Sequence, residues 1–187
     1  VGLQTDFSNG CPLELRLGGN ATVSGGVLKL TDVNVSDAVG YLGSSGWVIS
    51  NLPAPMPALW DWRVSFELYI GGGTGGNGFS FLYGDVAFMS HLDRVGGLTA
   101  YGESTYPNDD RAFEGLQVKF NTAGKYIHVT YNGTTLKVLE VKDALRTRAW
   151  VQVDLVYDIR GLTILHDGWY SWSHETSSDH IQVPGWN

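Results

Sequence analysis

The strongest pattern along the chain is the alternation of apolar and polar residues. From Trp62 to Ile70 every second residue is apolar, as it is in Leu116–Asn121, Ile127–Asn132 and Val151–Asp158. Because successive side chains of a strand point to opposite faces, this pattern predicts four strands with one buried face each.

Further strands are predicted where short runs are bounded by Gly, Asn or Asp. These runs are Val27–Leu30, Val39–Leu42, Gly78–Tyr83, Leu98–Tyr101, Thr135–Glu140 and Leu162–His166. Asn132-Gly133 is typical of a two-residue hairpin turn, in which both central residues need positive φ. A single helical turn is expected around Lys142–Arg148, and no 3.6-residue pattern persists elsewhere.

About ten short strands without long helices predict an all-β fold, a jelly-roll sandwich of two antiparallel sheets. With 187 residues the chain fits one domain, residues 1–187. Six apolar side chains are expected to be buried in its core: Phe66, Phe81, Phe120, Val129, Val153 and Leu155.

Charge and composition narrow the classes of partner. The formal net charge is -7, and the 12 Lys and Arg residues are scattered along the chain. Since nucleic-acid binding needs a basic face, we expect no nucleic-acid partner. No stretch approaches the ~20 apolar residues of a membrane-spanning helix, so direct membrane insertion is not expected.

Three N-x-S/T sequons, at Asn20, Asn34 and Asn132, lie in predicted turns. They predict N-glycosylation, and with it a secreted, extracellular or cell-surface location. Cys11 is the only cysteine and has no partner within the chain. It is therefore the candidate for an intermolecular disulfide.

Four motifs resemble those of concanavalin A-like domains. Gly75–Asp85 resembles the ADG-F-x-F strand of legume and other L-type lectins, Gly96–Gly102 their GG-x-LG loop, and Gly115–Thr122 their VEFDT strand. Leu145–Val153, followed by Leu162–Gly168, is similar to a stretch shared by concanavalin A-like lectin and glucanase domains. The resemblance spans most of the chain, and it implies a jelly-roll fold of the concanavalin A type.

The resemblance also implies a sugar site. In L-type lectins an Asp of the first motif, a Gly amide of the second and an Asn after the third contact the sugar. Here Asn77 replaces the Asp and Gly97 keeps the glycine, but no Asn matches after the third motif. The candidate carbohydrate-binding residues, aromatic platforms included, are Asn77, Gly97, Tyr101, Tyr106, Asn121 and Trp169.

The metal site of the lectins is not expected here. Their Ca²⁺ and Mn²⁺ rest on the Glu and Asp of the VEFDT strand, where this chain has Lys119 and Asn121. An ammonium group repels a divalent cation, so we expect neither a metal nor another cofactor. The acidic turn 108–110 is expected to be solvated rather than to bind Ca²⁺.

Catalysis is not expected either. Glucanases of this fold carry Glu-x-Asp-x-x-Glu on one strand, and no Glu of this chain is followed by Asp two residues later. The histidines match no metal or triad motif and are expected in turns and at the surface. They are His91, His128, His166, His174 and His180.

Two functions remain open. The chain could be a carbohydrate-recognition module with a glycan ligand, or a structural or adhesive building block that has lost sugar binding. Ile181–Asn187 is similar to the connection that leads into the closing strands of such domains. We therefore expect the fold to lack its closing strand, and another chain or segment to cover that sheet edge.

Overall fold

In a computed structural model of the chain, the described residues are 4–30, 46–50, 61–71, 78–84, 115–121, 126–140, 145, 148–166 and 180–183. The chain divides into two compact units, Val1–Met56 with Met89–Leu98, and Pro57–Phe88 with Thr99–Asn187. The regular secondary structure of the described residues consists of β-strands alone, and every strand pair is antiparallel. The prediction of an all-β, antiparallel protein is confirmed.

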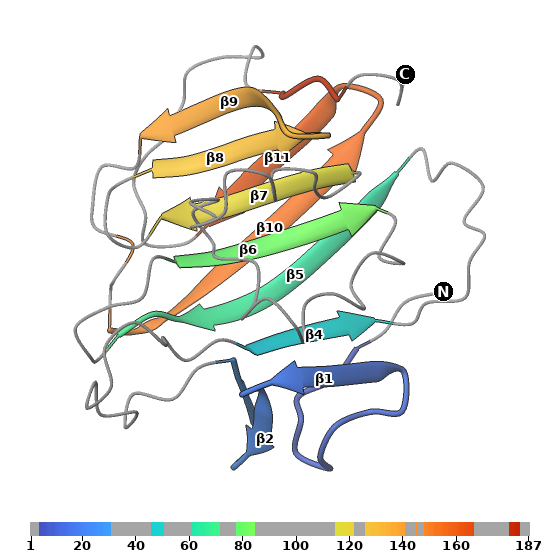
Figure 1. The fold of residues 1–187 in the computed structure, drawn as a ribbon, viewed down its shortest axis with the longest axis vertical. Helices are drawn as coiled ribbons and strands as arrows, with labels where there is room; N and C mark the ends of the chain where they lie inside the picture. The colour runs from blue at the N-terminus through green and yellow to red at the C-terminus, as the bar shows by residue number, and fades with distance from the viewer. Residues whose placement is uncertain are drawn as a thin grey trace. The chain divides into compact units, whose positions relative to one another are not determined.

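The first unit contains two small sheets (Figure 1). They pair β1 (Leu15–Gly19) with β4 (Gly46–Ser50), and β2 (Thr22–Ser24) with β3 (Val27–Lys29). Gly25 and Gly26, with φ of 60° and 73°, form the turn between β2 and β3. A Cβ on Gly46 would lie 2.2 Å from the carbonyl oxygen of Leu30, so only glycine fits there.

The second unit contains a three-stranded sheet in the order β11-β10-β5 and a four-stranded sheet in the order β6-β7-β8-β9 (Figure 1). The strands of the first are β5 (Trp62–Tyr69), β10 (Trp150–Asp158) and β11 (Gly161–His166). Those of the second are β6 (Gly78–Gly84), β7 (Gly115–Asn121), β8 (Tyr126–Tyr131) and β9 (Thr134–Glu140).

Two-residue turns join two of the neighbouring strand pairs in the second unit. Asn132 and Gly133 connect β8 to β9 with φ of 47° and 76°, which confirms the predicted hairpin. Ile159 and Arg160 connect β10 to β11, and the Asp158 carboxylate accepts a hydrogen bond from the Arg160 backbone N–H at 2.8 Å.

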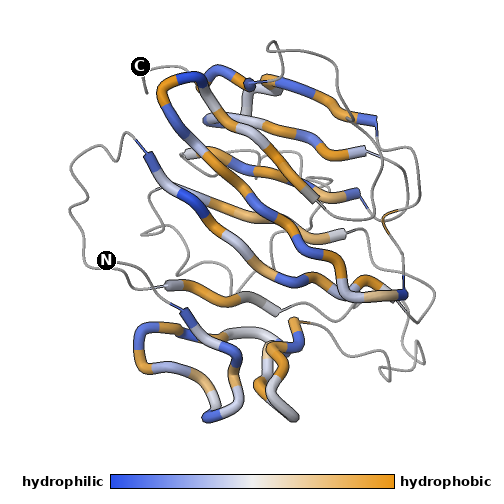
Figure 2. Tube along the Cα trace, turned by 180° about the vertical axis from the view of Figure 1, so that it is seen from behind, coloured by the Kyte–Doolittle hydropathy of each residue, from blue (hydrophilic) through white to orange (hydrophobic). Residues whose placement is uncertain are grey.

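One hydrophobic core is built from residues of both sheets of the second unit. Figure 2 shows the apolar and polar positions that alternate along these strands. Four of the side chains predicted to be buried are fully so: Phe120, Val129, Val153 and Leu155. Phe66 and Phe81 are only half-buried, and the prediction was wrong for them because β5 and β6 are end strands of the described sheets.

The C-terminal residues described here lie along β11. Ile181 and Leu162 exchange two backbone hydrogen bonds of 2.9 Å, and both Ile181 and Val183 are buried. A Cβ on Gly161 would come within 2.7 Å of the Ile181 carbonyl oxygen, so this contact depends on glycine. Whether a closing strand is missing stays a prediction.

Some strands were not predicted, and some predicted elements lie outside the described residues. The strands β1, β2 and β4 were not predicted from the sequence. The predicted strands Val39–Leu42 and Leu98–Tyr101, and most of the helical turn at Lys142–Arg148, lie outside the described residues. No helix long and apolar enough to cross a membrane occurs in the part of the chain that the structure describes.

Candidate functional site

The strand β7 is buried on both of its faces. Leu116, Val118 and Phe120 point into the core, as their alternation predicts. The intervening side chains were expected to face solvent, yet only 8% of Gln117 and 6% of Asn121 is exposed. The polar face of this strand is therefore enclosed, which is unusual because buried polar groups need partners.

The neighbouring strands extend this polar face. The register places Thr130 opposite Gln117, His128 opposite Lys119, and Tyr126 opposite Asn121. Directly opposed residues of paired strands share a face, so these side chains lie in one layer. With Ser80 of β6, which lies opposite Lys119, they make up what we call the polar layer: Ser80, Gln117, Lys119, Asn121, Tyr126, His128 and Thr130.

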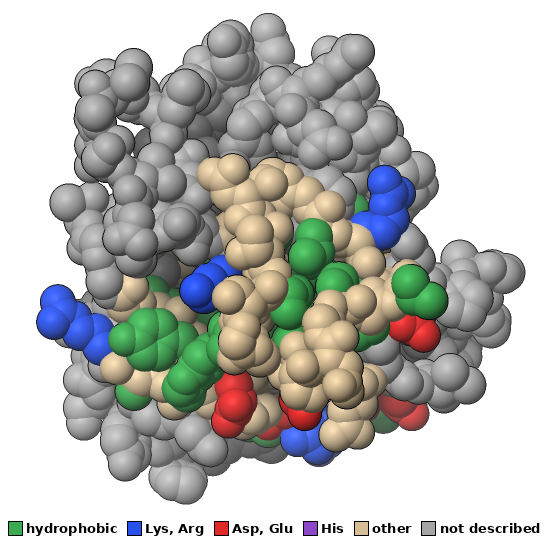
Figure 3. Space-filling model, turned by 90° about the horizontal axis from the view of Figure 1, so that it is seen from below, with side chains coloured by type: hydrophobic (Ala, Val, Ile, Leu, Met, Phe, Trp, Pro, Cys, Tyr) green, Lys and Arg blue, Asp and Glu red, His purple; other side chains and the backbone are tan. Residues whose placement is uncertain are grey.

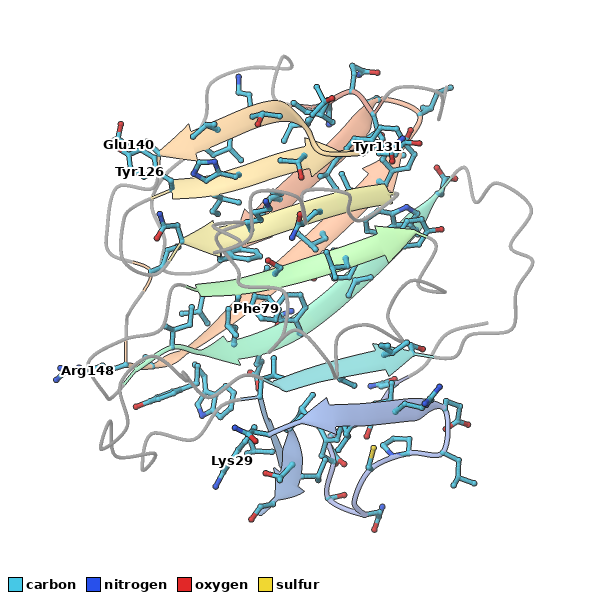
Figure 4. The ribbon with its side chains drawn as sticks, viewed as in Figure 1. Lys29, Phe79, Tyr126, Tyr131, Glu140 and Arg148 are labelled. Carbon is cyan, nitrogen blue, oxygen red and sulfur yellow. The ribbon has the colours of Figure 1, made fainter. Side chains whose placement is uncertain are left out.

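Exposure of the polar layer increases along β8, from Thr130 towards its first residue, Tyr126. Thr130 is only 7% exposed, whereas Tyr126 is 41% exposed. Tyr126 lies opposite Glu140, and Figure 4 shows both side chains at the same end of β8 and β9. A ligand that approaches from the solvent would thus meet Tyr126 and Glu140 first.

Contacts within the layer link neighbouring strands. The Gln117 Nε2 donates a hydrogen bond of 3.5 Å to the Ser80 Oγ. The rings of Tyr126 and His128 meet edge to face, with centroids 6.3 Å apart and an interplanar angle of 74°. These contacts fix the positions of amide, hydroxyl and aromatic groups relative to one another.

The charge state of His128 follows from its surroundings. Burial lowers the pKa of its imidazole, and the nearby Lys119 ammonium lowers the pKa further. At neutral pH the ring is therefore uncharged, with one nitrogen that donates and one that accepts a hydrogen bond. The expectation that the histidines lie in turns and at the surface was wrong for His128, which is a half-buried strand residue.

The polar layer can form many hydrogen bonds of both kinds. The amides of Gln117 and Asn121 donate and accept, as do the hydroxyls of Ser80 and Thr130, while Lys119 only donates. No group of three His, Cys, Asp or Glu side chains among the described residues could hold a metal ion. The layer thus presents hydrogen-bond donors and acceptors side by side, with the Lys119 ammonium as its charged group.

The structure describes only part of the predicted site. Asn121 lies in the polar layer. The other candidate carbohydrate-binding residues lie outside the described residues: Asn77, Gly97, Tyr101, Tyr106 and Trp169.

The structure also describes Asn20, Asn132 and Cys11, none of which is a residue of the polar layer. Asn20 and Asn132 are exposed in turns, as predicted, while Asn34 lies outside the described residues. Cys11 is exposed and is the one free cysteine of the chain. Glycosylation and an intermolecular disulfide stay predictions.

Sequence reasoning missed most of the polar layer. Gln117, Tyr126, His128 and Thr130 were not candidates, although the polar positions of two neighbouring strands alternate in step. These residues come together through the register of β7 against β8, and no short hairpin motif in the sequence predicts that pairing.

Charged side chains do not form one patch on the face seen in Figure 3, where acidic and basic groups of the described residues lie scattered.

A scan against protein-family models finds no match for this chain, and a search of curated proteins finds none either.

Proposed function

We propose that this chain is a non-catalytic carbohydrate-recognition module, extracellular or at the cell surface, with a jelly-roll sandwich of the concanavalin A type. The observation that carries the proposal is the polar layer, in which Gln117, Asn121 and Thr130 share one sheet face with Lys119 and His128. The resemblance of the sequence motifs to L-type lectins supports the same class of ligand.

The chemistry of the layer matches that of a sugar. Each hydroxyl of a sugar donates one hydrogen bond and accepts others, so a binding surface needs both kinds of group side by side. Side-chain amides and hydroxyls supply both, and an exposed aromatic ring such as Tyr126 offers a surface for the apolar face of the sugar. Lys119 takes the place of a metal ion as the positive group.

A second function is favoured by the low exposure of the layer. Side chains exposed by less than a tenth, such as Gln117 and Asn121, can also serve as a polar layer that specifies how the sheet packs. In that case the chain is a structural or adhesive building block of a larger extracellular assembly. The exposed Cys11 would then join it to another chain.

A glycan array compares the two functions. We expect the wild-type chain to bind at least one class of immobilised glycan, and Asn121→Ala to lose binding to the glycans that the polar layer recognises. Asn9→Ala is the matched control, because Asn9 is an exposed residue of the first unit. If the folded wild-type chain binds no glycan on a broad array, sugar recognition is overturned in favour of the structural function.

A further inference from the structure

An exposed aromatic pair lies on the three-stranded sheet, on the face that points away from the core. Tyr69 of β5 and Trp150 of β10 are directly opposed, and their side chains are 48% and 53% exposed. Their ring centroids are 5.5 Å apart, and the ring planes are tilted by 55°. Two large apolar rings half open to water form a surface that a ligand with an apolar face can cover.

The backbone beside the pair packs closely against the Tyr69 ring. Arg148 has a φ of 53°, in the left-handed region, and its N–H donates a hydrogen bond of 3.1 Å to the Ile70 carbonyl. A Cβ on Gly71 would lie 3.1 Å from both the Tyr69 ring and the Arg148 Cα. Figure 4 shows the Arg148 side chain extending away from the sheet. A left-handed residue other than glycine is costly, and such positions are concentrated at functional sites.

Polar groups follow directly along the same face. Glu67 and Gln152 are the next opposed pair on this face, about 7 Å from the aromatic pair along the strands. Gln152 is held in place because its Nε2 donates to Asp154 at 3.5 Å, and Asp154 also accepts a hydrogen bond of 3.0 Å from Arg63. The carboxylate of Glu67 and the amide of Gln152 thus stand beside the rings as hydrogen-bonding groups.

We propose that Tyr69 and Trp150 form a stacking surface for a neutral sugar ring, and that Glu67 and Gln152 bind its hydroxyls. A sugar ring has an apolar C–H face and a rim of hydroxyls, which fits an aromatic pair flanked by hydrogen-bonding groups. On this face of the described strands, Glu67 and Gln152 follow the two rings, and the other large exposed apolar side chain is Leu165, opposite Asp154. A stable protein interface needs about 800 Å² on each partner, more than two rings and a separate leucine supply.

The charge of the surface favours a neutral ligand over an anionic one. Among the described residues near the rings, Glu67 carries a negative charge and Arg148 a positive one, and Arg63 pairs with Asp154 at 3.0 Å, so the charges balance. The surface belongs to β5 and β10, so it is distinct from the polar layer of β6, β7 and β8 and does not depend on it.

The Trp150 indole N–H provides a direct test by NMR. The chain has seven tryptophans, and the indole signal missing from the spectrum of Trp150→Phe identifies Trp150. Titration with cellohexaose, laminarihexaose or mannohexaose should shift this signal to saturation with at least one of the three, while a hexamer of galacturonic acid should not. Trp150→Ala should weaken binding about tenfold, as measured from the backbone amides of β5.

Three further variants separate this proposal from its alternatives. Leu165→Ala removes an apolar side chain that is 52% exposed on the same sheet face, and it should leave binding unchanged. Gly71→Ala should weaken binding, since its Cβ would displace the Tyr69 ring. Asn121→Ala should leave the shift of the Trp150 signal intact, whatever it does to the polar layer.

The proposal is overturned if no neutral hexasaccharide moves the Trp150 signal, or if only the galacturonic acid hexamer does. It is equally overturned if Leu165→Ala weakens binding as much as Trp150→Ala does, because a general apolar surface would then be responsible. The Trp150→Phe variant keeps an aromatic ring opposite Tyr69 and should bind with an intermediate dissociation constant, even if Trp150→Ala does not fold.

Discussion

At the scale of single residues, the enclosed polar side chains distinguish this protein from a simple two-faced sheet. Gln117, Asn121 and Thr130 are each less than a tenth exposed. Burying such groups costs free energy unless hydrogen bonds replace those made with water, so their positions must be held by partners. The apolar residues that alternate with them stabilise the fold, since they form the hydrophobic core.

Phe120 tests that core. It is fully buried, and its ring lies 5.5 Å from that of Phe79, centroid to centroid. We expect Phe120→Ala to lower the free energy of unfolding by about 3–5 kcal/mol, because the variant leaves a cavity. Urea denaturation measures the change. Leu13→Ala is the control, since Leu13 is 98% exposed and its loss should change little.

His128 makes stability depend on pH. Burial and Lys119 hold the pKa of His128 below its ordinary value of 6.5. The unfolded chain therefore binds a proton at His128 more readily than the folded chain does. The contribution of neutral His128 to the free energy of unfolding is complete above about pH 6.5, and it is lost as the pH falls towards the lowered pKa. Between about pH 7 and pH 5, the free energy of unfolding should fall less in His128→Gln than in the wild type.

A second variant shows which neighbour is responsible. Lys119→Met removes the positive charge beside the imidazole, so the pKa of His128 measured by NMR titration should rise. An unchanged pKa in that variant, or an equal loss of stability in His128→Gln and the wild type, would contradict the electrostatic explanation.

At the scale of elements, strands with a long alternating pattern could be predicted from the sequence, and short ones could not. The pattern of Trp62–Ile70 gave β5, and that of Val151–Asp158 gave β10. The strand β2 has only three residues and β1 ends in Gly18-Gly19, so neither offers enough alternation to be recognised.

The candidate site was harder to predict than the strands. Alternation in β7 gives two faces, but it does not tell whether the polar face meets water or is enclosed. Sequence reasoning therefore found Asn121 through a motif and missed Gln117 and Thr130, whose burial depends on tertiary structure.

The hairpin between β8 and β9 can be tested through Asn132. Its φ is 47°, and its Oδ1 accepts a hydrogen bond of 2.8 Å from the Gly115 backbone N–H. Asn132→Ala removes the acceptor and disfavours the left-handed conformation, so the free energy of unfolding should fall by about 1–2 kcal/mol. Asn132→Asp keeps the oxygen and should cost less, and an equal loss in both variants would show that the hydrogen bond is unimportant.

At the scale of the whole molecule, the sequons and the acidic net charge bear on where the protein acts. Asn20 and Asn132 are exposed in turns of the structure, where a glycan can be attached without disturbing a core. We expect native material to carry glycans at one or more of Asn20, Asn34 and Asn132. Intact mass before and after amidase treatment checks this, and the absence of any mass shift would argue against secretion.

We propose that the polar layer binds a sugar without a metal ion. The side-chain amide NMR signals of Gln117 and Asn121 report on it directly when the folded chain is titrated, in the presence of EDTA, with a glycan that it binds on the array. We predict that both signals shift and reach saturation, and that added Ca²⁺ changes nothing. Signals that stay in place during the titration, or that shift only after Ca²⁺ is added, would contradict the claim.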